Sequence, residues 1–214
     1  MTTELPTAPT GLTPVRVLTV AGSDSGGGAG MQADLRTFAT LGVHGCVAVT
    51  AVTVQNSLGV QGFQEIEPQI VAGQITSVVT DIGIGAAKTG MLASSAIIEA
   101  VVDACGGLDI GGDGAIPLVA DPVCASMHGD PLLATGALDA LRTVLFPIAT
   151  VVTPNLDEVR LITGIDVVDD ASQRDAARAL HGLGARWALV KGGHLRSSAQ
   201  SPDLLFDGAQ FHEF

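Results

Sequence analysis

The sequence predicts an α/β fold with a mostly parallel central sheet that is flanked by helices on both faces. From Val15 onward, short apolar segments rich in β-branched residues alternate with helical patterns, which is typical of parallel strands joined by crossover helices. The composition agrees with this, because hydrophobic residues make up 47% of the 214 and charged residues only 15%. A sheet buried on both faces requires strands that are almost continuously apolar.

The expected strands lie, in chain order, at residues 15–21, 45–51, 86–89, 117–120, 150–152 and 187–190. The helical patterns between them lie at residues 31–41, 68–81, 94–105, 136–141, 156–163 and 170–183. In the first helix, Met31, Leu35 and Phe38 repeat at helical spacing and lie on one face.

The segments outside these elements are more polar. Residues 53–63 alternate weakly and predict an arm of one or two short strands outside the sheet, and residues 106–114 predict a flexible surface loop. Residues 1–14 are rich in Thr and Pro, so we expect a disordered N-terminal tail. Because no repeat or linker interrupts the rest, we expect residues 15–214 to form a single domain.

A glycine-rich loop joins the first strand to the first helix. Five glycines fall within nine residues: Gly22, Gly26, Gly27, Gly28 and Gly30. Glycine has no Cβ and lets the backbone approach a ligand closely. The joint between a strand and a helix is also where open α/β sheets usually bind small molecules. A small-molecule site is therefore the leading hypothesis for this loop.

Two familiar glycine loops do not fit these residues. The P-loop pattern requires Lys and Ser/Thr where Gly28 and Ala29 stand. A dinucleotide loop matches Gly28, Gly30 and Ala33 only formally. The acidic residue that should bind ribose about twenty positions later is missing, which disfavours an NAD-dependent oxidoreductase.

Charge and cysteine content exclude several other classes. The formal net charge is −12, and no cluster of Lys and Arg occurs, so we expect no nucleic-acid partner. No apolar run is long enough to span a membrane, and the N-terminus does not have the pattern of a signal peptide. Three widely spaced cysteines predict reduced, buried thiols in a cytoplasmic protein.

Polar residues follow several of the predicted strands. They are Asp121, Asn155, Glu158 and Lys191. Each has a simple structural interpretation: Asn155 and Glu158 fit a helix capping box, and Asp121-Pro122 fits a turn. All four nevertheless lie at the carboxyl ends of parallel strands, where ligands bind. Together they favour a nucleotide–Mg²⁺ site, and His128 is an additional candidate for lining the pocket.

Seven motifs, in order, resemble those of bacterial hydroxymethylpyrimidine/phosphomethylpyrimidine kinases. They read AGSDSGGGAGMQAD, AVTVQNSLGV, KTGML, ADPV, TPNLDE, VKGGH and SPDLLF. That family belongs to the ribokinase-like superfamily, so the resemblance implies a three-layer α/β/α fold. It also implies transfer of phosphoryl groups from ATP, with Mg²⁺, to 4-amino-5-hydroxymethyl-2-methylpyrimidine and then to its monophosphate, in thiamin biosynthesis.

The resemblance also implies roles for eight residues. Four would line the pyrimidine pocket, namely Gly22, Asp34, Gln55 and Met91. Two would contact ATP, namely Asn155 and Lys191. The remaining two, Asp121 and Glu158, would organise Mg²⁺ and its waters. Family members continue past the position of Phe214 into a glycine-rich anion-hole motif, which contains their base, so we assign no catalytic residue here.

Since the sequence ends before that motif, we expect either further C-terminal residues in the natural protein or a truncated, inactive relative. The intact upstream motifs favour the first. Two alternative functions remain: a pyridoxal kinase of the same superfamily, and an inactive pyrimidine-binding module. The resemblance and the polar arm at residues 53–63 suggest a homodimer.

Overall fold

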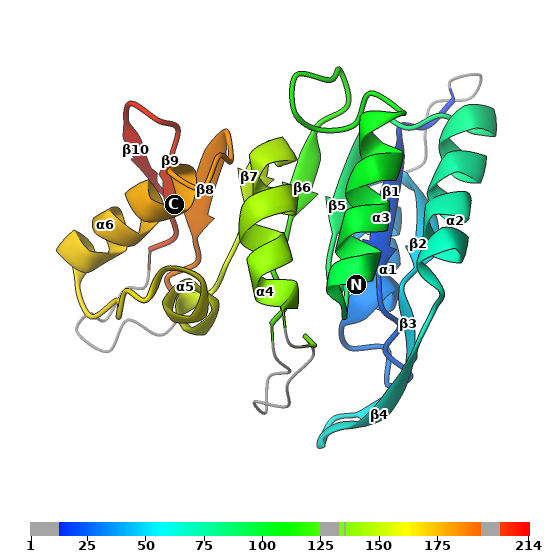
Figure 1. Cartoon of the computed structure of the whole chain (residues 1–214), viewed down its shortest axis with the longest axis horizontal. Helices are drawn as coiled ribbons and strands as arrows, with labels where there is room; N and C mark the ends of the chain where they lie inside the picture. The colour runs from blue at the N-terminus through cyan, green and yellow to red at the C-terminus, as the bar shows by residue number, and fades with distance from the viewer. Residues whose placement is uncertain (1–12, 125–132, 135, 194–201) are drawn as a thin grey trace, which may run out of the picture.

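One eight-stranded sheet forms the centre of the protein (Figure 1). The computed structural model describes residues 13–124, 133–134, 136–193 and 202–214. The strand order is β10-β9-β8-β7-β6-β5-β1-β2. Strands β1, β2, β5, β6, β7 and β8 pair in parallel, and β9 and β10 add an antiparallel hairpin at one edge. The mostly parallel sheet predicted from the sequence is therefore confirmed.

The strands of this sheet are short. They are β1 (Arg16–Ala21), β2 (His44–Val49), β5 (Ala86–Thr89), β6 (Leu118–Ala120), β7 (Val151–Val152), β8 (Trp187–Val190), β9 (Leu204–Phe206) and β10 (Phe211–Glu213). The last four residues of β1 are all buried, as required of a strand covered on both faces. In β3 (Ala51–Asn56), by contrast, buried and exposed residues alternate at first, which indicates a strand with one open face.

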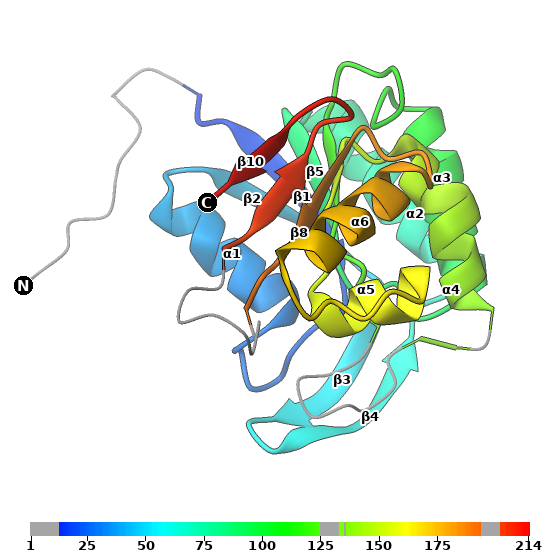
Figure 2. The same cartoon turned by 90° about the vertical axis from the view of Figure 1, so that its left-hand side faces the viewer.

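Helices cover both faces of the sheet. The helix α1 (Gly30–Thr40) lies on one face, while α2 (Pro68–Asp81), α3 (Ser95–Gly106) and α4 (Ala137–Ala140) lie on the other (Figure 2). Further along the chain, α5 (Leu156–Thr163) contacts α6 (Asp170–His181), which packs on β8 and β9. The expected three-layer α/β/α arrangement is confirmed. Each described helix is too short or too polar to cross a bilayer.

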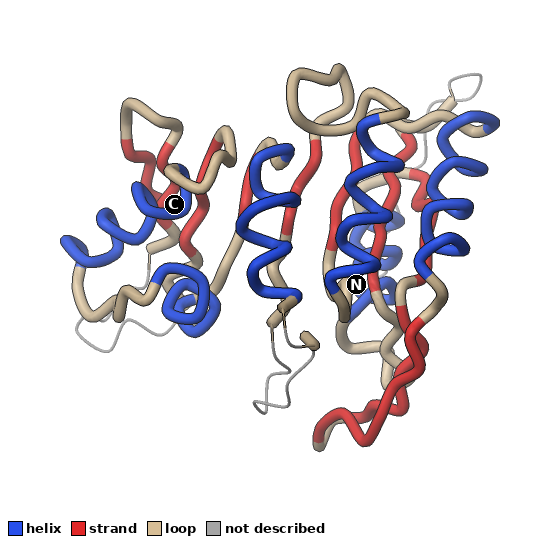
Figure 3. The backbone as a smooth tube through the Cα atoms, viewed as in Figure 1, coloured by secondary structure: helices blue, strands red, loops and turns tan. Residues whose placement is uncertain are grey.

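The predicted arm is a separate two-stranded sheet. It consists of β3 and the antiparallel β4 (Gly59–Glu65) and projects away from the central sheet (Figure 3). The expected strand at 45–51 therefore ends earlier, at Val49, and after Thr50 the chain enters the arm. The pairing register between β3 and β4 shifts at an irregularity between Val54 and Gln55.

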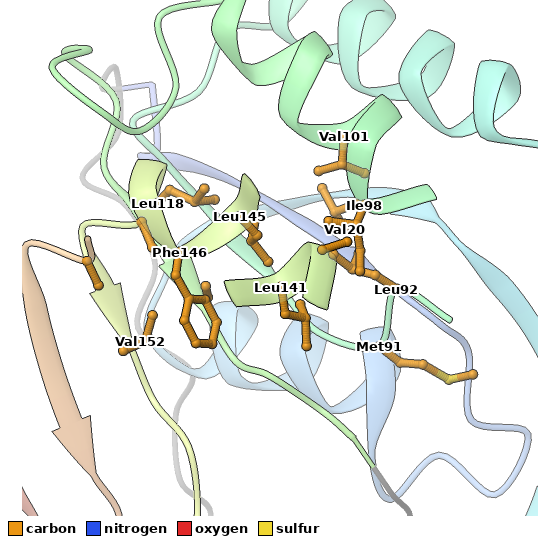
Figure 4. Packing of buried hydrophobic residues seen from close by; sticks show 14 of the residues in the cluster. Val20, Met91, Leu92, Ile98, Val101, Leu118, Leu141, Leu145, Phe146 and Val152 are labelled. Atoms are coloured by element: carbon orange, nitrogen blue, oxygen red, sulfur yellow. The ribbon is translucent and has the colours of Figure 1, made fainter. Parts of the chain in front are cut away.

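The core lies between the sheet and the layer that contains α3. Side chains from the strands (Val20, Leu118 and Val152) meet side chains from α3 and from the segment after α4 (Figure 4). That segment continues as a π-helical turn (Leu141–Leu145) and a 3-10 turn (Phe146–Ile148). The helical segment expected at 136–141 therefore extends further, to Ile148. Leu145 and Phe146 lie in this extension, and their burial favours it.

Two further parts of the structure differ from what the sequence predicts. Most of residues 106–114 are exposed, as expected of a surface loop, but Ile110 is buried and bridges to Ile116. The hairpin β9–β10 was not predicted, because each strand has only three residues and β9 joins the sheet by an antiparallel pairing with β8 that no local pattern specifies. Residues 1–12 of the expected tail lie outside the described residues.

Candidate functional site

A cavity of about 600 Å³ opens at the carboxyl ends of β1 and β5. Its walls come from the glycine-rich loop, the start of α1, the arm and the segments that follow β5 and β6. This is the edge at which open α/β sheets bind ligands, and the volume lies within the range of small-molecule sites. The cavity therefore lies at the glycine-rich loop, where the sequence predicts a small-molecule site.

The glycine-rich loop is organised around a carboxylate of its own. Asp24 accepts hydrogen bonds from the backbone N–H groups of Gly26, Gly28 and Ala29 at 2.8, 2.7 and 2.7 Å. Burial raises the pKa of Asp24, but these amide hydrogen bonds outweigh burial, and the pKa is lowered from its ordinary value. The Asp24 carboxylate thus accepts hydrogen bonds from backbone N–H groups that a phosphate-binding loop would donate to its ligand.

The same loop is tied to the arm. The Ser25 hydroxyl donates to the carbonyl oxygens of Thr53 and Gln55 and accepts from the N–H of Gln55 at 2.9 Å. Thr53 donates two further hydrogen bonds to Ser23, from its N–H to the Ser23 hydroxyl at 3.0 Å and from its own hydroxyl to the Ser23 carbonyl oxygen at 2.7 Å. These contacts fix the side of the cavity that the arm contributes.

All four residues expected at the pyrimidine pocket line this one cavity: Gly22, Asp34, Gln55 and Met91. They come from the end of β1, from α1, from the arm and from the segment after β5. A Cβ atom at Gly22 would lie 3.2 Å from Sδ of Met91, which is a crowded contact. The absence of a side chain at position 22 therefore keeps this part of the cavity open.

Lys88 on β5 is a residue of the cavity that sequence reasoning missed. Its Nζ donates to both carboxylate oxygens of Asp34, at 3.1 and 3.0 Å. Asp34 in turn accepts a hydrogen bond of 2.6 Å from the hydroxyl of the fully buried Thr19. The sequence does contain a signal for Lys88, namely a lysine within an apolar strand. Lysine is almost never fully buried unless it is paired with an opposite charge, so such a lysine indicates a charged partner nearby.

Asp121, after β6, connects the cavity to the second group of predicted residues. It lines the cavity, and its Oδ1 lies 3.1 Å from Nζ of Lys191. Its Oδ2 lies 3.9 Å from Nζ of Lys88. The hydroxyl of Thr153 also donates to Asp121, at 3.3 Å. The structure thus brings Asp121 and Lys191 together, as expected from their positions at strand ends.

Asn155 and Glu158 form the capping box that their spacing predicts. The N–H of Glu158 donates to Oδ1 of Asn155 at 2.9 Å, and the N–H of Asn155 donates to Oε2 of Glu158 at 2.8 Å. Both residues lie at the start of α5 and outside the lining of the cavity. The structural interpretation of this pair is therefore confirmed, and it leaves open an additional role in ligand binding.

Glu158 is nevertheless electrostatically unusual. Burial raises the pKa most, and the nearby Asp121 also raises it, whereas the N–H of Asn155 and the charge of Lys191 lower it; the net result is a pKa raised to about 7. Burial beside Glu158 and Asp121 also raises the pKa of the Cys124 thiol to about 12. A carboxyl group that titrates near neutral pH is typical of sites that bind cations or move protons.

Two further predictions concern a metal site and His128. Within the described residues, no three His, Cys, Asp or Glu side chains gather closely enough to form a metal cage. Asp121 and Glu158 therefore do not constitute a preformed site on their own. His128, the additional pocket candidate, lies outside the described residues.

The chain is similar in sequence and in fold to known kinases. A family model described as phosphomethylpyrimidine kinase matches residues 24–214. A hydroxymethylpyrimidine/phosphomethylpyrimidine kinase from Mycobacterium leprae is 67% identical and covers 98% of this chain, which spans 75% of that protein. The crystal structure of a phosphomethylpyrimidine kinase from Clostridium difficile 630 has a TM-score of 0.83 and 36% identity, with 94% of this chain and 84% of that chain covered.

A pyridoxal kinase is also similar. The Staphylococcus aureus enzyme in complex with AMP-PCP and pyridoxal has a TM-score of 0.81 and 32% identity, with 94% of this chain and 71% of that chain covered. The fold is therefore shared between enzymes whose names specify different substrates. Fold similarity alone does not choose between the two acceptors.

Proposed function

Because the chain belongs to the phosphomethylpyrimidine kinase family, we propose that it phosphorylates 4-amino-5-hydroxymethyl-2-methylpyrimidine and then its monophosphate with ATP. The reaction serves thiamin biosynthesis. One observation carries the proposal: Gly22, Asp34, Gln55 and Met91 line a single cavity that Asp121 joins to Lys191. Acceptor-binding and phosphate-binding groups are thus adjacent.

The cavity suits an aminopyrimidine. Gln55 carries a side-chain amide that can donate to a ring nitrogen and accept from an exocyclic amine, and no described residue forms a hydrogen bond with that amide. Met91 supplies an adaptable apolar surface for the ring. Asp34 lies at the side of the cavity near Lys88, where its carboxylate can accept a hydrogen bond from a hydroxyl group of the acceptor.

The nucleotide belongs on the side of Asp121 that faces Lys191. Lys191 is the cation expected to meet ATP phosphate, and its side chain is 38% exposed, so it remains accessible. Asn155 begins α5 beside it, where a phosphate would also meet the positive end of the helix dipole. Positioning and neutralisation of charge account for most of the catalysis in phosphoryl transfer.

Asp121 and Glu158 would hold Mg²⁺. Two carboxylates without a complete cage suit this ion, which keeps several waters and is bound through few carboxylates plus substrate phosphates. The elevated pKa of Glu158 fits the same role, because a nearby cation would stabilise the ionised form. When bound, Mg²⁺ would neutralise phosphate charge.

A product assay by mass spectrometry tests the proposed function. The protein is incubated with ATP, Mg²⁺ and the hydroxymethylpyrimidine, and pyridoxal is supplied in a parallel reaction. We expect mono- and diphosphorylated pyrimidine as products. Phosphorylation of pyridoxal alone would favour the pyridoxal kinase alternative, whereas tight pyrimidine binding without any product would favour the inactive binding module.

We further propose that the protein acts as a cytoplasmic homodimer that pairs through its arm. Three apolar side chains of the arm are largely exposed, namely Val52, Val54 and Leu58 at 53, 62 and 81%, and such patches mark interaction surfaces. All three cysteines are free and buried, which suits a reducing compartment. Light scattering should show a dimer that Val54→Asp converts to a monomer; a wild-type monomer would contradict the proposal.

A further inference from the structure

The chain contains only two lysines, Lys88 and Lys191, and both approach the same carboxylate. Nζ of Lys191 lies 3.1 Å from Oδ1 of Asp121, and Nζ of Lys88 lies 3.9 Å from Oδ2. Because Lys88 also pairs with Asp34 at 3.0 Å, the four side chains alternate in charge from the cavity to the proposed nucleotide site. Lys191 has an assigned role in this arrangement, but Lys88 has none.

Lys88 is the one cation among the described residues that line the cavity. An ammonium group has three N–H donors, and the described hydrogen bonds of Lys88 go only to the two oxygens of Asp34. The distance of 3.9 Å to Asp121 is too long for a hydrogen bond. Lys88 therefore retains a donor for a ligand, and its side chain is 21% exposed.

The surroundings hold this ammonium group in place. A Cβ atom at Gly90 would lie only 3.1 Å from Nζ of Lys88, so a glycine at this position gives the ammonium its space. On the other side, the buried hydroxyl of Thr19 bonds to Asp34 at 2.6 Å and fixes the carboxylate that Lys88 contacts. Lys88 is thus positioned by its neighbours, as a ligand-binding cation must be.

The two acceptors of the proposed reaction differ in charge. The first is an uncharged alcohol, whereas the second carries a phosphate group of about −1.5 to −2 charge at neutral pH. The carboxylates of Asp34 and Asp121 both line the cavity and would repel such a phosphate. A cation between them can donate a charge-assisted hydrogen bond to the phosphate. It would offset this repulsion and allow the monophosphate to bind.

We propose that Lys88 binds the phosphate group of the monophosphorylated acceptor and thereby allows the second phosphoryl transfer. The inference rests on the proposed function and specifies a determinant of acceptor choice within the same cavity. A lysine that serves only as a counter-ion for Asp34 and Asp121 would affect both acceptors equally. Lys88 is instead expected to distinguish the charged acceptor from the uncharged one.

Calorimetry with the two acceptors tests this directly, because binding is measured without turnover. In Lys88→Met, we expect the Kd for the monophosphate to rise roughly 10- to 100-fold, the range of one hydrogen bond to a charged group. The Kd for the uncharged hydroxymethylpyrimidine should rise by a clearly smaller factor, because Lys88 affects this acceptor only through its two bonds to Asp34. Lys88→Arg should retain most of the preference, because it keeps the charge.

Gly90→Ala provides a second variant in which Lys88 itself is retained. The added Cβ should displace the ammonium and weaken binding of the monophosphate more than binding of the alcohol. Equal weakening of both acceptors in Lys88→Met, or no change for the monophosphate, would overturn the inference. If the wild-type protein binds neither compound, the proposed function is contradicted as well, and the inference falls with it.

Discussion

The backbone N–H of Ala29, which immediately precedes α1, donates a hydrogen bond of 2.7 Å to the carboxylate of Asp24. The glycine-rich loop therefore encloses an anion that belongs to the chain itself. The N–H groups of Gly26, Gly28 and Ala29 already donate to this carboxylate, so they are not free for a phosphate in this structure.

Replacing this internal anion should destabilise the protein. In Asp24→Asn, the charge-assisted bonds to the loop amides are lost, and one amide loses its acceptor. We expect the free energy of unfolding to fall by about 1–3 kcal/mol, measured by chemical denaturation. Asp109→Asn, in a loop remote from the cavity, is the control, and equal stability of the two variants would contradict a structural role for Asp24.

The two glycines at the ends of this loop should respond differently to alanine. Gly30 has a φ of +56°, and its Cβ would lie 2.5 Å from the carbonyl oxygen of Gly22, so Gly30→Ala should lower the melting temperature substantially. In Gly22→Ala, the tightest contact of the new Cβ is with the flexible end of Met91, at 3.2 Å, so this variant should leave stability nearly unchanged while weakening pyrimidine binding. Thermal unfolding and calorimetry separate the two effects, and a reversed order would contradict this assignment.

Gln55 should contribute to pyrimidine binding but not to nucleotide binding. In Gln55→Ala, the loss of two hydrogen bonds to the ring edge should raise the Kd for hydroxymethylpyrimidine roughly 10- to 100-fold. Affinity for ATP should stay nearly the same. Gln64→Ala, on the same arm but outside the cavity lining, is the matched control. Equal loss of both ligands in Gln55→Ala would argue against the pocket assignment.

Variants of the two capping boxes, at the starts of α5 and α6, should distinguish a role in metal binding from a role in helix stability. Glu158→Gln keeps a side-chain acceptor at this position but removes its charge, so we expect a raised Mg²⁺ requirement with little loss of stability. Asp169→Ala removes the corresponding cap of α6, where Asp169 pairs with Ser172. That variant should lose about 0.5–2 kcal/mol of stability with an unchanged Mg²⁺ requirement, as measured by Mg²⁺ titration of the kinase reaction.

If Glu158→Gln instead lowers the melting temperature and leaves the Mg²⁺ requirement unchanged, Glu158 serves as a cap alone.

The pH dependence of stability should also depend on Glu158. Its pKa rises from 4.5 to about 7 on folding because of burial, so between these values the folded state holds a proton that the unfolded chain has lost. This contribution to stability is fully present below pH 4.5 and is lost as pH rises through about 7. Without ligands, the melting temperature of wild type relative to Glu158→Gln should therefore fall between pH 5 and 8, and parallel profiles would contradict the burial effect.

Local pattern was sufficient for much of the architecture. The alternation of apolar strands and helical segments predicted the parallel sheet, because each element depends on residues close together in the chain. The capping box at Asn155 and Glu158 was predictable for the same reason, since its partners are three positions apart. The same patterns did not predict the β9–β10 hairpin, in which β9 pairs with β8 and β10 pairs with β9.

The sequence alone determined the fold class, the position of the glycine-rich loop and the residue types available at the strand ends. Only the tertiary structure decided which charges meet. Lys88 and Asp34 are 54 positions apart, and Lys191 and Asp121 are 70 apart, so no local spacing predicts either pair. A charge in an apolar strand is tolerated only where the fold supplies its partner, and the folded sheet is what brings these partners to one edge.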